Sequence, residues 1–220
     1  MSKYAELFNQ LHKKQESFTL SPSLLSFLKN EVQPYLITHD IVLENCLEIG
    51  CGTQSLLEVW PILGNEISKT AVDCSLVAIK KAKTHFPQSE VSYIVADIAN
   101  NELLSFPSGA LRDLVPQDII LDGHALHFIK DKSDRAMAFK NIYNLLRADG
   151  VFVAESTIRT NSFQASDSFH LPYAHELEDE ILKAGFEIKI FIVKPGLHLE
   201  SYEDGVVERF EVVTFIARKK

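Results

Sequence analysis

The sequence predicts an α/β fold: a doubly wound, mostly parallel sheet of seven strands with helices on both faces and an antiparallel C-terminal strand. From residue 45 onward, short apolar segments alternate with amphipathic segments of helical spacing. This alternation is typical of parallel strands joined by crossover helices. The last two apolar segments, 186–193 and 208–217, have no helix between them, so the final strand is expected to return antiparallel to its neighbour.

Each element is expected from its local pattern. Seven apolar segments are expected to form strands: 45–49, 69–72, 91–96, 118–121, 151–154, 186–193 and 208–217. Helices are expected through 56–60, over 75–83 with Ser75 as N-cap, over 132–146 and over 173–184. Asp149 and Gly150 are expected to end the third of these helices, and Gly185 to end the fourth.

Two segments lie outside this alternation. Residues 1–40 are predicted to form an N-terminal helical cap, in which Ser23 can cap a helix with an apolar face. Residues 41–220 are predicted to form a single α/β domain, within which 156–172 is expected to be a loop on the substrate side. The side chains of this loop and of the adjoining Tyr173 either close over a polar, partly aromatic molecule or cap the sheet at the surface: Arg159, Asp167, Phe169, His170 and Tyr173.

Composition excludes several classes of protein. Hydrophobic residues make up 46% of the 220 residues and charged residues 24%, which is typical of a globular domain. A net charge of −8 makes a nucleic-acid partner unfavourable, because phosphate binding needs clustered Lys and Arg. No apolar run reaches the roughly 20 residues of a membrane helix. Three cysteines without a CxxC pair, and no signal peptide, favour the cytoplasm.

Acidic residues follow four successive predicted strands. Glu48, Asp73, Asp97 and Asp122 each stand at or just after a strand end. The carboxyl ends of parallel strands meet at one edge of a sheet, where ligands bind in such folds. A glycine turn, G-C-G at 50–52, follows the first strand and lets a ligand approach bare backbone. A carboxylate beside that turn suits a hydroxyl or a positive charge better than a phosphate.

A dinucleotide-binding dehydrogenase is the main competitor for a glycine turn between a strand and a helix. Its G-x-G-x-x-G pattern fails because Ser55 stands where the third glycine belongs. Glu48 would also place a carboxylate beside the pyrophosphate. The dehydrogenase interpretation is therefore disfavoured.

The ordered motifs resemble those of class I S-adenosylmethionine-dependent methyltransferases. The resemblance is carried by LEIGCGT at 47–53, AVDCS at 71–75, VADI at 95–98 and DIILDGHALH at 118–127. LLRADGVFV at 145–153 is similar to the family's turn from a helix into the fifth strand. The resemblance runs from about residue 43 to the C-terminus. It implies a Rossmann-like methyltransferase fold and S-adenosyl-L-methionine as cofactor.

The resemblance also implies roles for the residues of the first two motifs. Glu48, Gly50 and Gly52, with Cys51 between the glycines, would hold the methionine and ribose part of the cofactor. The Glu48 carboxylate favours the cationic ammonium group or a bound water. Asp73 would accept hydrogen bonds from both ribose hydroxyls, which one carboxylate can do.

The later motifs would hold the adenine and the reacting end of the cofactor. Asp97 would accept a hydrogen bond from the adenine amino group, while Ile98 and Cys74 pack against the ring. Asp122 would lie near the sulfonium and the incoming acceptor. One departure is Gln54, where the family often has a third glycine. Gln fits there if its φ is that of an ordinary helix, whereas a positive φ would cost roughly 1 kcal/mol or more.

Two histidines follow the fourth predicted strand. His124 and His127, together with Asp122, are the candidate catalytic residues, as general base or as groups that position the acceptor. A purely structural role for His127 remains open. Two histidines without a further convergent ligand are weak evidence for metal, so no metal is predicted.

The sequence thus predicts a methyltransferase that moves the methyl group of S-adenosyl-L-methionine to an O, N or S atom of an unidentified acceptor. A small molecule is the first expectation, since the chain is acidic and no separate recognition domain is evident. Two alternatives stay open: a protein methyltransferase, and a non-catalytic S-adenosylmethionine-binding or scaffold protein. No membrane partner is expected, and the oligomeric state is left open.

Overall fold

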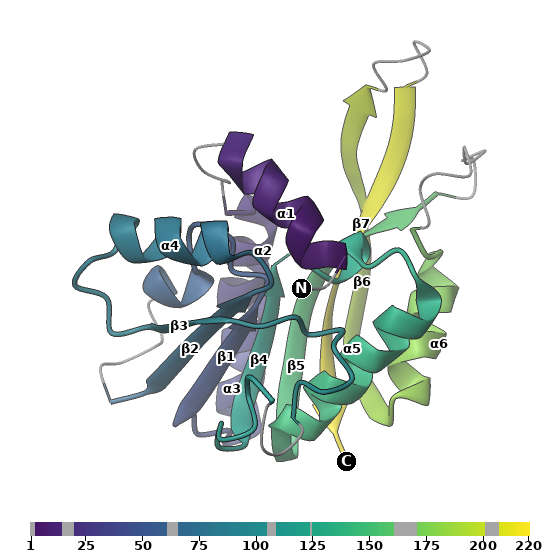
Figure 1. Cartoon of the computed structure of the whole chain (residues 1–220). Helices are drawn as coiled ribbons and strands as arrows, with labels where there is room; N and C mark the ends of the chain where they lie inside the picture. The colour runs from purple at the N-terminus through teal and green to yellow at the C-terminus, as the bar shows by residue number, and fades with distance from the viewer. Residues whose placement is uncertain are drawn as a thin grey trace.

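The computed structural model describes residues 3–14, 20–60, 66–104, 109–123, 125–160, 171–200 and 207–220. Its centre is one seven-stranded sheet, in the order β3-β2-β1-β4-β5-β7-β6 (Figure 1). The strands are β1 Asn45–Ile49, β2 Ser68–Asp73, β3 Ser92–Val95, β4 Gln117–Gly123, β5 Leu146–Arg159, β6 Phe186–Glu200 and β7 Val207–Lys219.

The strand directions confirm the predicted fold class. Strands β1 to β5 pair in parallel, and β7 runs antiparallel between β5 and β6. The strand order reverses direction next to β1, whose neighbours are β2 and β4. In open α/β sheets this switch point is where a crevice forms for a ligand.

Helices cover both faces of the sheet. The α-helices are α1 Lys3–Lys14, α2 Pro22–Phe27, α3 Gln33–Thr38, α4 Leu76–His85, α5 Lys132–Leu145 and α6 Ala174–Lys183. A π-helical segment, Leu28–Val32, joins α2 to α3, and short 3-10 turns stand at Leu56–Glu58 and Leu126–Phe128. Figure 1 shows α5 and α6 together on one side of the sheet, while α2, α3 and α4 pack on the other.

The alternation of side chains in the central strands explains this layering. In β5, Val151 and Val153 pack in the cluster of α2 to α4, whereas Phe152 and Ala154 pack in the cluster of α5 and α6. Successive strand residues point to opposite faces, so a strand covered on both faces needs a continuous apolar run. This run is the pattern that predicted the strand.

Two expectations for the first half of the chain were wrong. Ser21, and not Ser23, caps α2: its hydroxyl accepts from the Leu24 N–H at 3.2 Å. The helix expected through 56–60 is only a 3-10 turn over Leu56–Glu58. Proline at position 61 disfavours helical backbone in the residue before it, which explains why the turn does not continue.

The region after α5 also differs from the prediction. The helix ends at Leu145 and β5 begins directly, so Asp149 and Gly150 do not end it. Asp149 instead takes a positive φ of 64° inside the extended segment. β5 continues to Arg159, within the expected loop 156–172, because Arg159 pairs with Phe210 of β7. Asp167, Phe169 and His170 lie outside the described residues.

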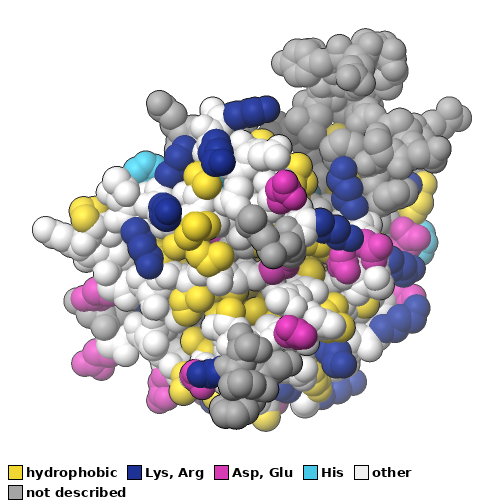
Figure 2. Space-filling model, in the orientation of Figure 1, with side chains coloured by type: hydrophobic (Ala, Val, Ile, Leu, Met, Phe, Trp, Pro, Cys, Tyr) yellow, Lys and Arg dark blue, Asp and Glu magenta, His cyan; other side chains and the backbone are white. Residues whose placement is uncertain are grey.

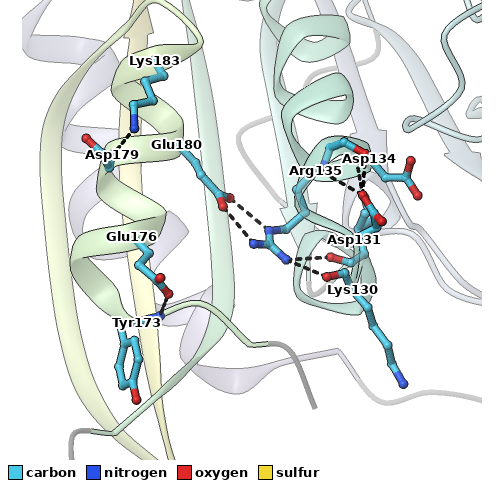
Figure 3. A network of polar contacts seen from close by, with 11 residues as sticks. Lys130, Asp131, Asp134, Arg135, Tyr173, Glu176, Asp179, Glu180 and Lys183 are labelled. Atoms are coloured by element: carbon cyan, nitrogen blue, oxygen red, sulfur yellow. Dashed lines mark hydrogen bonds and ion pairs between the residues drawn. The ribbon is translucent and has the colours of Figure 1, made fainter. Parts of the chain in front are cut away.

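A buried ion pair joins α5 to α6 (Figure 3). The Arg135 guanidinium donates from Nε and Nη2 to the two carboxylate oxygens of Glu180, at 3.0 and 2.8 Å. Its Nη1 donates to the carbonyls of Ile129 and Lys130, at 3.0 and 3.3 Å. Removing one partner of such a buried pair typically costs about 3–5 kcal/mol. Arg135 therefore fixes both the helix pair and the chain that follows the 3-10 turn Leu126–Phe128.

Charged side chains are distributed over the surface, and Figure 2 shows Lys and Arg gathered over α4 and the adjoining end of α1. Lys80 and Lys83 are exposed there, as expected for a solvated helix face. No helix among the described residues has the length and apolar character needed to cross a membrane. The division into a cap at 1–40 and a single domain at 41–220 stays a prediction.

Candidate functional site

A cavity of about 330 Å³ lies where the carboxyl ends of β1 to β4 meet. Helix α1 forms one wall of it, and Figure 1 shows this helix lying across the same end of the sheet. The volume is within the range of small-molecule sites. The structure brings nine of the predicted site residues together in its lining: Glu48, Gly50, Cys51, Gly52, Asp73, Cys74, Asp97, Ile98 and His127.

The glycine turn after β1 depends on the absence of side chains. Gly50 and Gly52 both have positive φ, 65° and 56°. A Cβ on Gly50 would lie only 2.2 Å from the Cβ of Ala125, whereas a Cβ on Gly52 would meet nothing nearer than His12 Cε1 at 3.7 Å. The N–H of Cys51 donates to the carbonyl of Val72 at 3.0 Å, which ties the turn to β2. The turn thus presents bare backbone to the cavity.

Gln54 does not need the backbone of a glycine. Positive φ among the described non-glycine residues occurs only at Asp40 and Asp149. The replacement therefore carries no left-handed strain. The Gln54 side chain lines the cavity and adds an amide to it.

Glu48 is a buried carboxyl at the base of the cavity, 2% exposed. One oxygen accepts from the Ser55 hydroxyl and from the Leu56 N–H, the latter at 2.8 Å. Burial raises the pKa of Glu48 to about 8, although hydrogen bonds from Ser55 and Leu56 act in the opposite direction. Without a cation beside it, this carboxyl holds its proton at neutral pH.

Glu48→Gln is expected to remove a pH dependence of stability. Because the folded pKa of about 8 exceeds the unfolded value, the folded state binds the extra proton, and this contribution is complete below the unfolded pKa. It is lost as the pH rises toward and through 8. Wild type should therefore lose stability relative to Glu48→Gln between about pH 5 and 9. Urea unfolding across this range measures the difference.

Exposed Glu6 provides the control for this measurement. Glu6→Gln should keep the same pH dependence as wild type, because its carboxyl remains in water. A constant difference in free energy of unfolding between wild type and Glu48→Gln at all pH values would contradict the raised pKa.

Asp73 connects the glycine turn to the start of α4. One carboxylate oxygen accepts from the Gly52 N–H at 2.9 Å, and the other from the Ser75 N–H at 2.7 Å. Burial raises the pKa of Asp73, and the hydrogen bonds from Ser75 and Gly52 oppose this. Each carboxylate oxygen can accept more than one hydrogen bond, so both retain capacity for a ligand hydroxyl.

The segment after β3 forms a mostly apolar wall with one carboxylate. Asp97 accepts from the Ala99 N–H at 3.0 Å, which shapes the turn. The Asn141 amide of α5 donates to the carbonyls of Ile98 and Asn100, at 2.8 and 2.9 Å. Burial raises the pKa of the nearby Cys74 thiol, which therefore stays neutral. An apolar wall beside a carboxylate suits a flat ring that carries an amino group.

The three candidate catalytic residues are placed differently. Asp122 is fully buried and does not line the cavity; its carboxylate accepts from the N–H groups of Ala125 and Leu126, at 2.6 and 3.2 Å. It thereby holds the turn that carries His127. His127 lines the cavity beside Phe128, with ring centroids 4.1 Å apart. His124 lies outside the described residues. The proposed chemical roles of these residues stay predictions.

Helix α1 supplies residues that the motif analysis missed. Tyr4, Phe8 and His12 line the cavity from α1 and are spaced four residues apart, which places them on one face of the helix. The Tyr4 hydroxyl donates to Asp134 of α5 at 2.8 Å. Further along α1, the Asn9 amide oxygen accepts from the Ser75 hydroxyl at 2.9 Å. The i, i+4 spacing is the signal in the sequence that could have identified this wall.

Part of the chain matches a known domain family and a known protein. A family model described as a methyltransferase domain matches residues 47–154. Nodulation protein S of Azorhizobium caulinodans is 29% identical over 111 residues, 50% of this chain and 48% of that protein. The chain therefore matches about half the length of this curated relative.

Two solved structures are similar over nearly the whole chain. One is an S-adenosylmethionine-dependent methyltransferase from Clostridium acetobutylicum, with a TM-score of 0.64 and 16% identity, covering 99% of this chain and 98% of that one. The other is the N-methyltransferase NodS from Bradyrhizobium japonicum in complex with S-adenosyl-L-homocysteine, with a TM-score of 0.60 and 16% identity, covering 96% and 97%. The matched domain assigns the chain to the family of S-adenosylmethionine-dependent methyltransferases, and the two solved structures share its fold.

Proposed function

We propose that this chain transfers the methyl group of S-adenosyl-L-methionine to a nitrogen atom of a small molecule. The main support for the proposal is the acidic lining of the cavity. Its described lining contains the carboxyl groups of Glu48, Asp73 and Asp97, and neither Lys nor Arg. Such a lining favours a cationic cofactor and an amine acceptor over anionic ligands.

The lining residues fit the cofactor group by group. Glu48 would bind the ammonium group, whose positive charge would favour the ionised form of this carboxyl. Asp73 would accept from the ribose hydroxyls with the lone pairs that its backbone partners leave. Asp97 would accept from the adenine amino group while Ile98 packs against the ring. The methionine part would lie against the bare backbone of Gly50, where no Cβ can be accommodated.

The acceptor end of the reaction needs alignment and loss of a proton. The bound cofactor supplies an electrophilic methyl group. The acceptor nitrogen would form its bond to the methyl carbon as the carbon–sulfur bond breaks, and the electron pair would stay on sulfur. Holding the reacting atoms in line provides most of the acceleration. His127 is the cavity residue suited to accept the proton from the nitrogen, and Asp122 would position it through the turn.

Two further considerations favour a small-molecule amine over a protein side chain. Helix α1 closes one side of the cavity with the apolar side chains of Phe8 and Leu11, which limits access for a folded protein surface. The similar solved protein NodS is described as an N-methyltransferase. A protein acceptor and a non-catalytic binding role are the outcomes against which the proposal is tested.

Methyl transfer to paired acceptors tests this proposal. Phenethylamine and tryptamine, each paired with the alcohol of the same skeleton, are incubated with the protein and methyl-tritiated S-adenosyl-L-methionine. The acidic, partly apolar cavity predicts label on the amines and much less on the alcohols. His127→Ala should lower the rate on the amines, most near neutral pH, where the amine is protonated and an unprotonated imidazole can accept its proton. Preferred transfer to the alcohols or to polypeptide, or cofactor binding with no transfer, would contradict the proposal.

A further inference from the structure

His12 lies directly over the glycine turn. It stands in the last turn of α1, outside the segment 47–154 that matches the family model, and is 4% exposed. Its Cε1 atom is 3.7 Å from the position of a Cβ on Gly52. Cε1 is the carbon between the two ring nitrogens, so the polar part of the imidazole is at the turn. A ligand that lies on the glycine backbone therefore passes next to this ring.

The acidic cavity has few groups that can bind an anion. A cofactor with an amino-acid end carries a carboxylate as well as an ammonium group. The carboxyl groups of Glu48 and Asp73 suit the ammonium and oppose the carboxylate. Among the described lining residues, the side chains with N–H donors are His12, His127 and Gln54. Of these, His12 lies within contact distance of the turn at Gly52.

A positively charged side chain, Lys81, contacts the backbone of His12. The Lys81 ammonium of α4 donates to the His12 carbonyl at 2.7 Å. Burial lowers the pKa of His12, and the charge of Lys81 lowers it further, so the ring is neutral and keeps one N–H donor. The field of Lys81 favours an anion at this end of the cavity, in contrast to the end at Glu48.

Helix α1 is held in place relative to Asp73. Asn9, one turn before His12, accepts from the Ser75 hydroxyl at 2.9 Å and from the Val77 N–H at 3.1 Å. The Ser75 N–H in turn donates to Asp73 at 2.7 Å. Helix α1, which carries His12, and the Asp73 carboxylate thus belong to one hydrogen-bonded frame.

We propose that His12 binds the carboxylate of the cofactor's amino-acid end and so makes α1 part of the cofactor site. This assignment rests on the proposed function, since it presumes the same cofactor. It gives α1 a specific role in ligand recognition in addition to enclosing the cavity. The predicted distinction is between ligands with and without that carboxylate.

Calorimetric titration with S-adenosyl-L-methionine and with decarboxylated S-adenosylmethionine tests the assignment, because the two ligands differ by this one group. His12→Ala should weaken binding of the first ligand by about 10- to 100-fold, the range for a hydrogen bond to a charged group. Binding of the decarboxylated ligand should change less than about twofold. His12→Gln, which keeps an N–H donor, should retain part of the preference for S-adenosyl-L-methionine over the decarboxylated ligand.

His39 provides the matched control. It is an exposed histidine at the end of α3, stacked on Tyr35 with ring centroids 4.1 Å apart. His39→Ala should bind both ligands as wild type does. Equal weakening of both ligands by His12→Ala, or no weakening, would overturn the assignment. If His12→Ala does not fold, His12→Gln is titrated with the same two ligands, and an equal change in both affinities would likewise overturn the assignment. Wild type that binds neither ligand would contradict the proposed function itself.

Discussion

Gly50→Ala is expected to destabilise the protein by about 2–5 kcal/mol and to abolish cofactor binding. Two costs add. A left-handed conformation costs a non-glycine residue about 1–2 kcal/mol, and Gly50 has a φ of 65°. The new Cβ would also lie 2.2 Å from the Cβ of Ala125, so the turn and the chain after β4 must separate. Urea unfolding and calorimetry with S-adenosyl-L-homocysteine measure the two effects.

Gly52→Ala and a compensating change at position 125 separate the two costs. Gly52 has a similar φ of 56°, but its new Cβ would meet only His12 Cε1 at 3.7 Å. Gly52→Ala should therefore cost only the conformational part, about 1–2 kcal/mol. Adding Ala125→Gly to Gly50→Ala removes the closest contact and should recover part of the stability. Equal costs for the two glycine substitutions, or no recovery, would contradict this account of the turn.

The fold was predictable because the central strands have a strong pattern. Strands such as β1 and β5 are covered on both faces, so they need continuous apolar runs that stand out from their surroundings. The boundaries that were missed depend on contacts far along the chain. Ser156–Arg159 is extended because it pairs with β7, more than 50 residues later. No local pattern carries that information.

The site was predictable where backbone topology alone brings residues together. Glu48, Asp73 and Asp97 follow neighbouring parallel strands, so their meeting in one cavity follows from the sheet order. The same reasoning fails for Asp122, because its side chain turns to the N–H groups of Ala125 and Leu126 and does not line the cavity. Strand position determines where a residue stands but not which partner its side chain takes.

The motifs could not predict the contribution of α1 to the cavity, for a different reason. The spacing of Tyr4, Phe8 and His12 shows that they share one helix face. It does not show that this face packs against the cavity. The polar contacts of Tyr4 with Asp134 and of Asn9 with Ser75 set the position of this face. Both contacts join residues far apart in the sequence, and only the folded chain reveals them.

Asp73→Asn is expected to weaken binding of S-adenosyl-L-homocysteine by about 100-fold or more, since two charge-assisted hydrogen bonds to the ribose hydroxyls are affected. Asp118→Asn is the matched control. Asp118 is also a buried carboxylate, and it accepts from the N–H groups of Glu44 and Asn45 at 2.6 and 2.7 Å, at the amino end of β4 away from the cavity. Asp118→Asn should lower stability and leave the affinity unchanged.

Calorimetric titration of S-adenosyl-L-homocysteine into wild type and these two variants tests the central claim most directly. Wild type and Asp118→Asn are expected to bind, whereas Asp73→Asn should lose affinity by about 100-fold or more. No binding by the wild-type protein, or equal affinity in wild type and Asp73→Asn, would contradict the assignment of the cavity to S-adenosyl-L-methionine.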